Sequence, residues 1–138
     1  MAWVVDTNLV IDVAVNDPAF GSRSSTCLQT HRPDGLVIAP ITYAELAPVF
    51  AGNRSAQEAF LASLSIAWQS VLTWNDVQEA WAACHRCVAA KRSGRGRMPP
   101  RRVADMFVGA FALRQQGLLT RNPGDFLPHF PRLPIHVP

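Results

Sequence analysis

The chain has 138 residues and a mass of 15.1 kDa, which fits one compact domain over 1–138 and excludes a second large one. Hydrophobic residues make up 49% of it and charged residues 17%, so it has apolar surface for a core and is not broadly disordered. The formal net charge of +3 is too small by itself to indicate a polyanionic partner.

No segment marks the chain for secretion or for a membrane. Residues 1–10 lack a basic region, a continuous apolar stretch and a cleavage site. No uncharged apolar run reaches the roughly 18 residues of a membrane-spanning helix. The three cysteines, Cys27, Cys84 and Cys87, are an odd number and a poor basis for a disulfide framework. We therefore expect a cytoplasmic protein without a membrane partner.

The first third of the chain is predicted to hold two buried strands separated by helical sequence. The apolar, β-branched run 2–5 predicts a strand that ends at Asp6. Asp17 and the proline after it can begin a helix, and the turn at 33–35 precedes a second apolar run at 36–39. This order is typical of a sheet whose strands are connected through helices.

The middle of the chain is predicted to be mainly helical. Thr42 and Glu45 have the spacing of a capping box, which predicts a helix continuing to about residue 52. Ser55 and Glu58 repeat that spacing and predict the next helix, and a third strand is expected near 70–73.

A further helix is expected from Asn75. Its predicted buried stripe consists of Val77, Trp81, Cys84 and Val88. The four tryptophans are all interpreted as core residues: Trp3, Trp68, Trp74 and Trp81.

The last third predicts a helix over 102–116, a strand over 118–120, a turn at Pro123 and an edge strand over 134–137. Apolar strands that alternate with helices predict an α/β fold. Its central, mostly parallel sheet of four to five strands would be covered on both faces, in a three-layer α/β/α arrangement.

Polar residues follow the predicted strands in a recurring way. Asp6 comes directly after the first strand, and Glu45 lies in the helix after the second. Asp105 lies near the start of the helix that feeds the 118–120 strand, and Asn122 and Asp125 follow that strand. In a parallel sheet all these positions belong to the carboxyl edge, so the five side chains are expected to meet there.

Several carboxylates that converge without a basic partner repel each other unless a divalent cation neutralises them. The expected ligands are all oxygen atoms, which favours Mg²⁺ or Mn²⁺ over Zn²⁺. Such a site suits hydrolysis of a phosphodiester by water.

Each acidic residue also has a purely structural interpretation. Asp6 could only cap a helix, Glu45 could belong to the capping box, and Asp105 could be a surface residue favoured by the helix dipole. Asn122 and Asp125 could be ordinary turn residues. The other acids are interpreted as caps, turn residues or solvated charges: Asp12, Asp17, Asp34, Asp76 and Glu79.

At these residues the chain resembles the PIN-domain ribonucleases, in particular the VapC-like toxins of bacterial toxin–antitoxin systems. The resemblance runs in order along nearly the whole chain, through 4–8 (VVDTN), 41–46 (ITYAEL), 104–112 (ADMFVGAFA) and 119–126 (LTRNPGDF). It implies a PIN-like fold and an Mg²⁺- or Mn²⁺-dependent endoribonuclease. The partners that it implies are an RNA substrate, a cognate antitoxin and a second copy in a homodimer.

The resemblance also implies the site residues. Asp6, Glu45 and Asp105 correspond to the three principal metal-site acids of the family. Many relatives carry an acid where this chain has Asn122, so the fourth acidic role falls to Asp125, or Asn122 holds water or phosphate as a neutral group. The supporting polar residues are Thr7, Asn8 and Thr120.

A basic segment precedes the third of these motifs and contains six of the thirteen Lys and Arg residues. The candidates for contact with an RNA backbone are Arg95, Arg97, Arg101 and Arg102; the alternative is a solvated loop. The competing interpretation of the whole chain is a catalytically silent PIN-like module that binds RNA or protein. Cys84 and Cys87 lack the second ligand pair of a structural zinc site, and the histidines at 31, 129 and 136 are expected at the surface.

Overall fold

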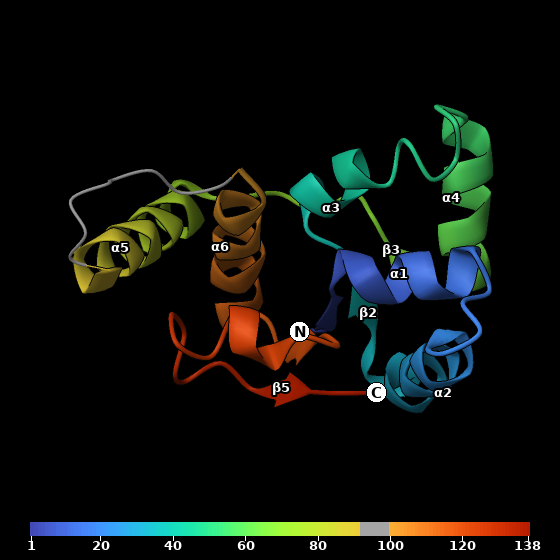
Figure 1. Ribbon diagram of the computed structural model, residues 1–138. Coiled ribbons are helices and arrows are strands. Elements are labelled where there is room, and N and C mark those ends of the chain that lie inside the picture. The colour runs from blue at the N-terminus through green and yellow to red at the C-terminus, as the bar shows by residue number, and fades with distance from the viewer. Residues whose placement is uncertain (92–99) are drawn as a thin grey trace.

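The computed structural model describes residues 1–91 and 100–138, and it contains a five-stranded sheet in the order β3-β2-β1-β4-β5 (Figure 1). Every neighbouring pair of strands is parallel. The strands are β1 (Trp3–Val5), β2 (Leu36–Val37), β3 (Ile66–Ala67), β4 (Gly117–Leu119) and β5 (Ile135–His136).

Helices cover both faces of this sheet, which confirms the predicted three-layer α/β/α architecture (Figure 1). They are α1 (Thr7–Ala14), α2 (Gly21–His31), α3 (Pro40–Glu45), α4 (Arg54–Ser63), α5 (Trp74–Lys91) and α6 (Pro100–Leu113), with single 3-10 turns η1 (Arg32–Asp34) and η2 (Pro123–Asp125). Among the described helices, none is long and apolar enough to cross a membrane.

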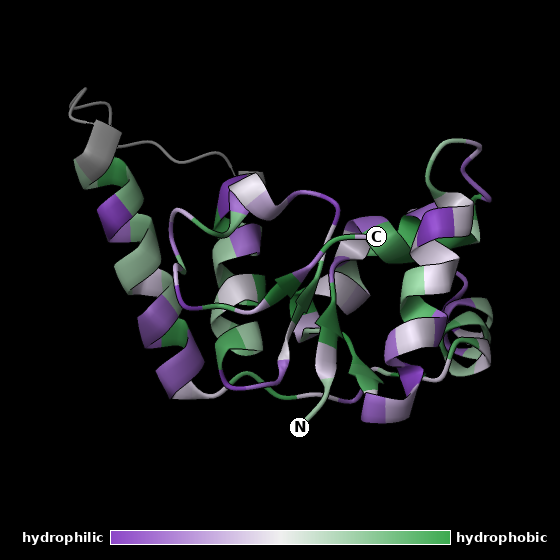
Figure 2. Ribbon diagram, turned by 90° about the horizontal axis from the view of Figure 1, so that it is seen from below, coloured by the Kyte–Doolittle hydropathy of each residue, from purple (hydrophilic) through white to green (hydrophobic). Residues whose placement is uncertain are grey.

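Alternate side chains of the central strands pack into two separate hydrophobic cores, one on each face of the sheet. Val4 and Leu118 pack with α5 and α6, whereas Val5 and Leu119 pack with α1, α2 and α4. Most residues of the strands are therefore apolar, and Figure 2 shows much of their length in green. A side chain at Gly117 would come within 2.6 Å of the Pro134 carbonyl oxygen, so glycine is needed where the start of β4 lies against the residue before β5.

The register places the carboxyl ends of β1 and β4 side by side, because Val5 is paired with Leu119. The backbone amide of Asp6 continues the ladder by donating to the Leu119 carbonyl at 3.0 Å. The residues that follow these two strands therefore begin at one edge of the sheet.

The structure differs from the predicted elements at α1 and at the third strand. Helix α1 is an addition to the predicted elements, since its β-branched Val10, Ile11 and Val13 have low helix propensity and the helix forms by burying Leu9 and Val10. The third strand is Ile66–Ala67 and not 70–73. A two-residue strand is too short to show an alternation of apolar and polar residues in the sequence. It is recognised only by its pairing with β2.

Both predicted capping boxes are also wrong. Helix α3 begins with Pro40 after Ala39, and it ends at Glu45 without continuing to residue 52. Thr42 is a fully buried position inside α3 and caps nothing. Helix α4 is capped by Asn53, whose side chain accepts a bond from the Ala56 amide, and Ser55 lies inside the helix.

The predicted stripe of α5 is displaced by one residue. Its buried apolar residues are Ala80, Ala83 and Cys87, because α5 packs closely against α6 through small side chains. Trp74 and Trp81 are 73% and 68% exposed, so their assignment to the core is wrong. Trp3 is buried and Trp68 packs against the core beside α1, as expected.

Asp76 is not a solvated charge. It is buried at the start of α5, where it accepts bonds from the Thr73 amide and from the Arg114 guanidinium at 2.8 Å. Burial alone would raise the pKa of Asp76, but these donors outweigh it and leave the pKa below its usual value.

Candidate functional site

A pocket of about 220 Å³ opens at the carboxyl ends of β1 and β4. The five polar residues expected at this edge all line it, together with two supporting polar residues and one apolar side chain. The lining consists of Asp6, Thr7, Asn8, Ile11, Glu45, Asp105, Asn122 and Asp125. None of these is Lys or Arg.

Asp6 is the most buried acid of the pocket, with 6% of its surface exposed. One carboxylate oxygen accepts from the Thr7 amide at 2.8 Å, which makes Asp6 the N-cap of α1, and the other accepts from the Thr120 hydroxyl at 2.7 Å. Burial raises the pKa of Asp6 to about 6, with smaller contributions from the charges of Glu45 and Asp125 and despite both hydrogen bonds. The residue that caps α1 is thus also a buried carboxylate close to other acids.

Glu45 is held by a hydroxyl chain that the sequence analysis did not predict. The Thr7 hydroxyl oxygen lies 2.8 Å from the Glu45 carboxylate and 3.1 Å from the Thr42 hydroxyl. A hydroxyl carries one proton and an ionised carboxylate only accepts, so Thr7 donates to Glu45 and accepts from Thr42. Glu45 therefore faces the end of β1, not its own helix cap.

Thr120 connects the other side of the pocket to Asp6. Its hydroxyl is fully buried, donates to Asp6 and accepts from the Asn122 amide at 3.1 Å. The Asn8 side-chain amide lies 3.5 Å away from the same hydroxyl, and the Asn8 carbonyl oxygen is buried without a hydrogen-bond partner among the described residues. The pocket thus contains an unused oxygen acceptor beside its acids.

Asp105 reaches the pocket from the beginning of α6, and Asn122 and Asp125 reach it from the turn after β4. Asp125 belongs to η2, which begins directly after Asn122. Both side chains therefore line the same pocket.

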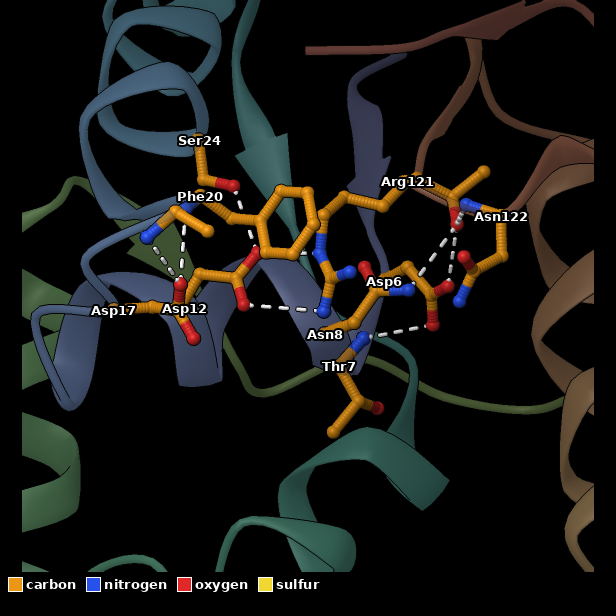
Figure 3. Close-up of polar contacts among 11 residues, drawn as sticks. Asp6, Thr7, Asn8, Asp12, Asp17, Phe20, Ser24, Arg121 and Asn122 are labelled. Carbon is orange, nitrogen blue, oxygen red and sulfur yellow. Dashed lines mark hydrogen bonds and ion pairs between the residues drawn. The ribbon is translucent and has the colours of Figure 1, made fainter.

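Asp12 is a correction to the sequence interpretation, because it is not a solvated charge. It is 2% exposed and pairs with Arg121, whose Nε donates to it at 2.7 Å (Figure 3). No sequence signal indicated this pair, since its members are 109 residues apart.

The proposed RNA contacts lie largely outside the described residues. Arg95 and Arg97 are outside the described ranges, as is the side chain of Arg101, and Arg102 is half-buried near the start of α6. Their roles remain predictions.

The oxygen donors of the pocket fit a hydrated divalent cation. No group of three described His, Cys, Asp or Glu side chains is arranged to ligate one ion directly. Mg²⁺ usually keeps several waters and binds through one or two carboxylates, so a wide acidic pocket is compatible with it. The raised pKa of Asp6 comes mainly from burial and in smaller part from the nearby Glu45 and Asp125 carboxylates, and the Asn8 side-chain oxygen is a spare acceptor among the described residues.

The histidines form contacts beyond those expected. His31 lies in α2, and its Nε2 is 2.8 Å from Nδ1 of His136 at β5, with Trp3 packed against both rings. His85 stacks on the exposed Trp81. These contacts lie outside the acidic pocket.

The fold of the chain occurs in a solved structure. No family model matches the sequence, and no curated protein matches it. One structural match is a chain in the crystal structure of VapBC2 from Rickettsia felis bound to a DNA fragment from their promoter, with a TM-score of 0.59 and 13% identity over 99% of this chain and 98% of that one. The chain therefore has the PIN-like α/β/α fold, shared with a chain of the VapBC2 structure over almost its full length.

Proposed function

We propose that the protein is an Mg²⁺- or Mn²⁺-dependent endoribonuclease and the toxin of a toxin–antitoxin pair. The observation that carries this proposal is the pocket at the carboxyl edge of the sheet. There a buried aspartate with a raised pKa faces further carboxylates, and within the described ranges 1–91 and 100–138 no lysine or arginine lines the pocket. A divalent cation is the simplest group that neutralises such a pocket.

The residues that would hold the cation are Asp6, Glu45, Asp105 and Asp125. When bound, it supplies charge stabilisation for the hydrolysis of a phosphodiester by water. Thr120 and the Thr7 amide fix both oxygens of Asp6, and the Thr7 hydroxyl fixes Glu45. These contacts preorganise the acids, so binding of the cation requires little rearrangement.

RNA is the proposed substrate, and the basic segment before α6 is proposed to contact its phosphates through Arg95, Arg97, Arg101 and Arg102. The proposed protein partners are an antitoxin and a second copy of the chain. The support for the antitoxin is the likeness in fold to a chain of VapBC2, together with the motifs quoted above.

The test is incubation of the purified protein with a pool of structured RNAs and Mg²⁺, followed by mapping of the cleaved ends. We expect discrete cuts that EDTA abolishes and that Asp6→Asn, a change of nearly equal volume, reduces by orders of magnitude. Cleavage that survives both chelation and this substitution contradicts the proposal. RNA binding without cleavage identifies the silent module instead.

A further inference from the structure

The ion pair between Asp12 and Arg121 joins helix α1 to the turn after β4, beside the pocket. Asp12 lies one helical turn after Asn8, and Arg121 lies between Thr120 and Asn122. These neighbours all belong to the pocket or to its hydrogen bonds. Arg121 is thus a permanent positive charge next to a pocket whose charged residues, among those that the structure describes, are all acidic.

The Arg121 guanidinium is hydrogen-bonded to Asp12 along its edge and packs against the Phe20 ring with its face. Its Nε and Nη2 donate to the two oxygens of Asp12 at 2.7 and 3.2 Å, and the Ser24 hydroxyl donates to Asp12 at 2.9 Å. The Phe20 ring lies 4.1 Å from the guanidinium carbon, and Phe20 is itself fixed by a bond from its amide to Asp17. Figure 3 shows the Arg121 side chain extending away from Asn122 and toward Asp12.

The direction of Arg121 affects the charge of the pocket. Without Asp12, the carboxylates of the pocket become candidate acceptors for Arg121, because its neighbours Thr120 and Asn122 contact Asp6 or line the pocket. A guanidinium pairs readily with carboxylates in a bidentate geometry. Such pairing would place an internal cation where the divalent metal is proposed to bind.

We propose that Asp12 is a positioning residue that holds the Arg121 guanidinium out of the acidic pocket, leaving the pocket free for a divalent cation. This inference rests on the proposed function, since it assumes that the pocket binds metal. It assigns Asp12 a role beyond linking α1 to the turn: the buried carboxylate is the internal counterion that keeps Arg121 from competing with the metal.

The test measures Mn²⁺ binding by calorimetry, without RNA and independently of cleavage. We expect Asp12→Asn to weaken Mn²⁺ binding by about tenfold. The double variant Asp12→Asn with Arg121→Gln should bind Mn²⁺ close to the wild-type value, because the competing charge is gone. Glu79→Gln, which removes an exposed acid of α5, is the control for net charge and should leave binding unchanged.

The double variant separates this role from simple loss of structure, because a purely structural pair would not regain metal affinity when its second member is also removed. Circular dichroism checks that each variant is folded. Asp12→Ala provides a second single substitution with the same expected result. Wild-type affinity in a folded single variant overturns the inference, as does a double variant as weak as Asp12→Asn. Absence of Mn²⁺ binding in the wild type, or unchanged binding in Asp6→Asn, overturns the metal site itself.

Discussion

Thr120 donates a hydrogen bond of 2.7 Å to Asp6, although the two residues are 114 positions apart in the chain. The bond joins the ends of two neighbouring parallel strands and is completely buried. It lowers the pKa of Asp6 against the larger effect of burial, and so keeps the carboxylate available at neutral pH.

We expect Thr120→Val to reduce RNA cleavage at pH 7 by at least about tenfold, and to destabilise the protein by about 1 to 3 kcal/mol. Valine has nearly the shape of threonine but cannot donate to Asp6. The measurements are cleavage rates from pH 5.5 to 8.5 and thermal unfolding. Thr120→Ser retains the hydroxyl and should preserve the pH profile; an unshifted profile in the valine variant would show that the bond does not control Asp6.

The raised pKa of Asp6 gives the metal-free protein a defined dependence on pH. The folded state holds the Asp6 proton up to a pKa of about 6, whereas the unfolded state releases it near 3.8. The stability from this group is therefore greatest below the unfolded value, and it is lost as the pH rises to about 6.

Asp6→Asn should accordingly stabilise the protein in EDTA at pH 8, by about 1 to 3 kcal/mol, and should not stabilise it at pH 3.5. With saturating Mn²⁺ at pH 8 the wild type should be more stable than Asp6→Asn, because only the wild type gains binding energy from the metal. Melting temperatures in the two buffers provide the comparison. An Asn variant that is less stable than the wild type in EDTA at pH 8 would contradict the assigned pKa.

Thr42 is expected to act on Glu45 through Thr7. Thr42→Val removes the hydroxyl that donates to Thr7, freeing Thr7 to turn away from the carboxylate. We expect about a threefold to tenfold loss in kcat with little change in KM, because orientation and not RNA binding is affected. Thr42→Ser is the matched control. Equal activity of Thr42→Val and Thr42→Ser would show that the Thr42 hydroxyl has no influence on Glu45.

The roles of Asn122 and Asp125 can be distinguished by how a substitution at each changes the metal dependence of cleavage. If Asp125 supplies the fourth carboxylate, Asp125→Asn raises the Mg²⁺ concentration needed for half-maximal cleavage, and Asn122→Ala mainly impairs positioning of the substrate. A carboxylate neutralises Mg²⁺ and an amide does not, so we expect this result. An Asp125→Asn enzyme with normal metal dependence and a lower melting temperature would assign the role to Asn122.

The basic segment is tested by replacing Arg95, Arg97 and Arg101 together with glutamine. RNA binding should weaken, and the slope of log Kd against log salt should fall by about two to three units if these arginines contact phosphates. Mn²⁺ binding should stay unchanged, which distinguishes this effect from damage to the pocket. An unaltered slope would make the segment a solvated loop.

The sequence by itself determined the layer architecture and the position of the acids along the sheet. Apolar runs such as that before Asp6 predict buried parallel strands, and right-handed connections carry every strand end to one edge. Glu45 and Asp105 could thus be assigned to that edge without knowledge of any contact. The assignment depends only on periodicity and chain order, which are local properties.

The tertiary structure alone decided which groups orient the acids. Thr42 reaches Thr7 across 35 residues, and Arg121 reaches Asp12 across 109, so no local spacing could indicate either contact. Helix α5 shows the same limit in the core. Its apolar pattern admits more than one buried face, and the close approach of α6 to Ala80 and Ala83 leaves Trp81 in solvent. Packing against α6 thus buries a different face of α5 from the one that the sequence pattern predicted.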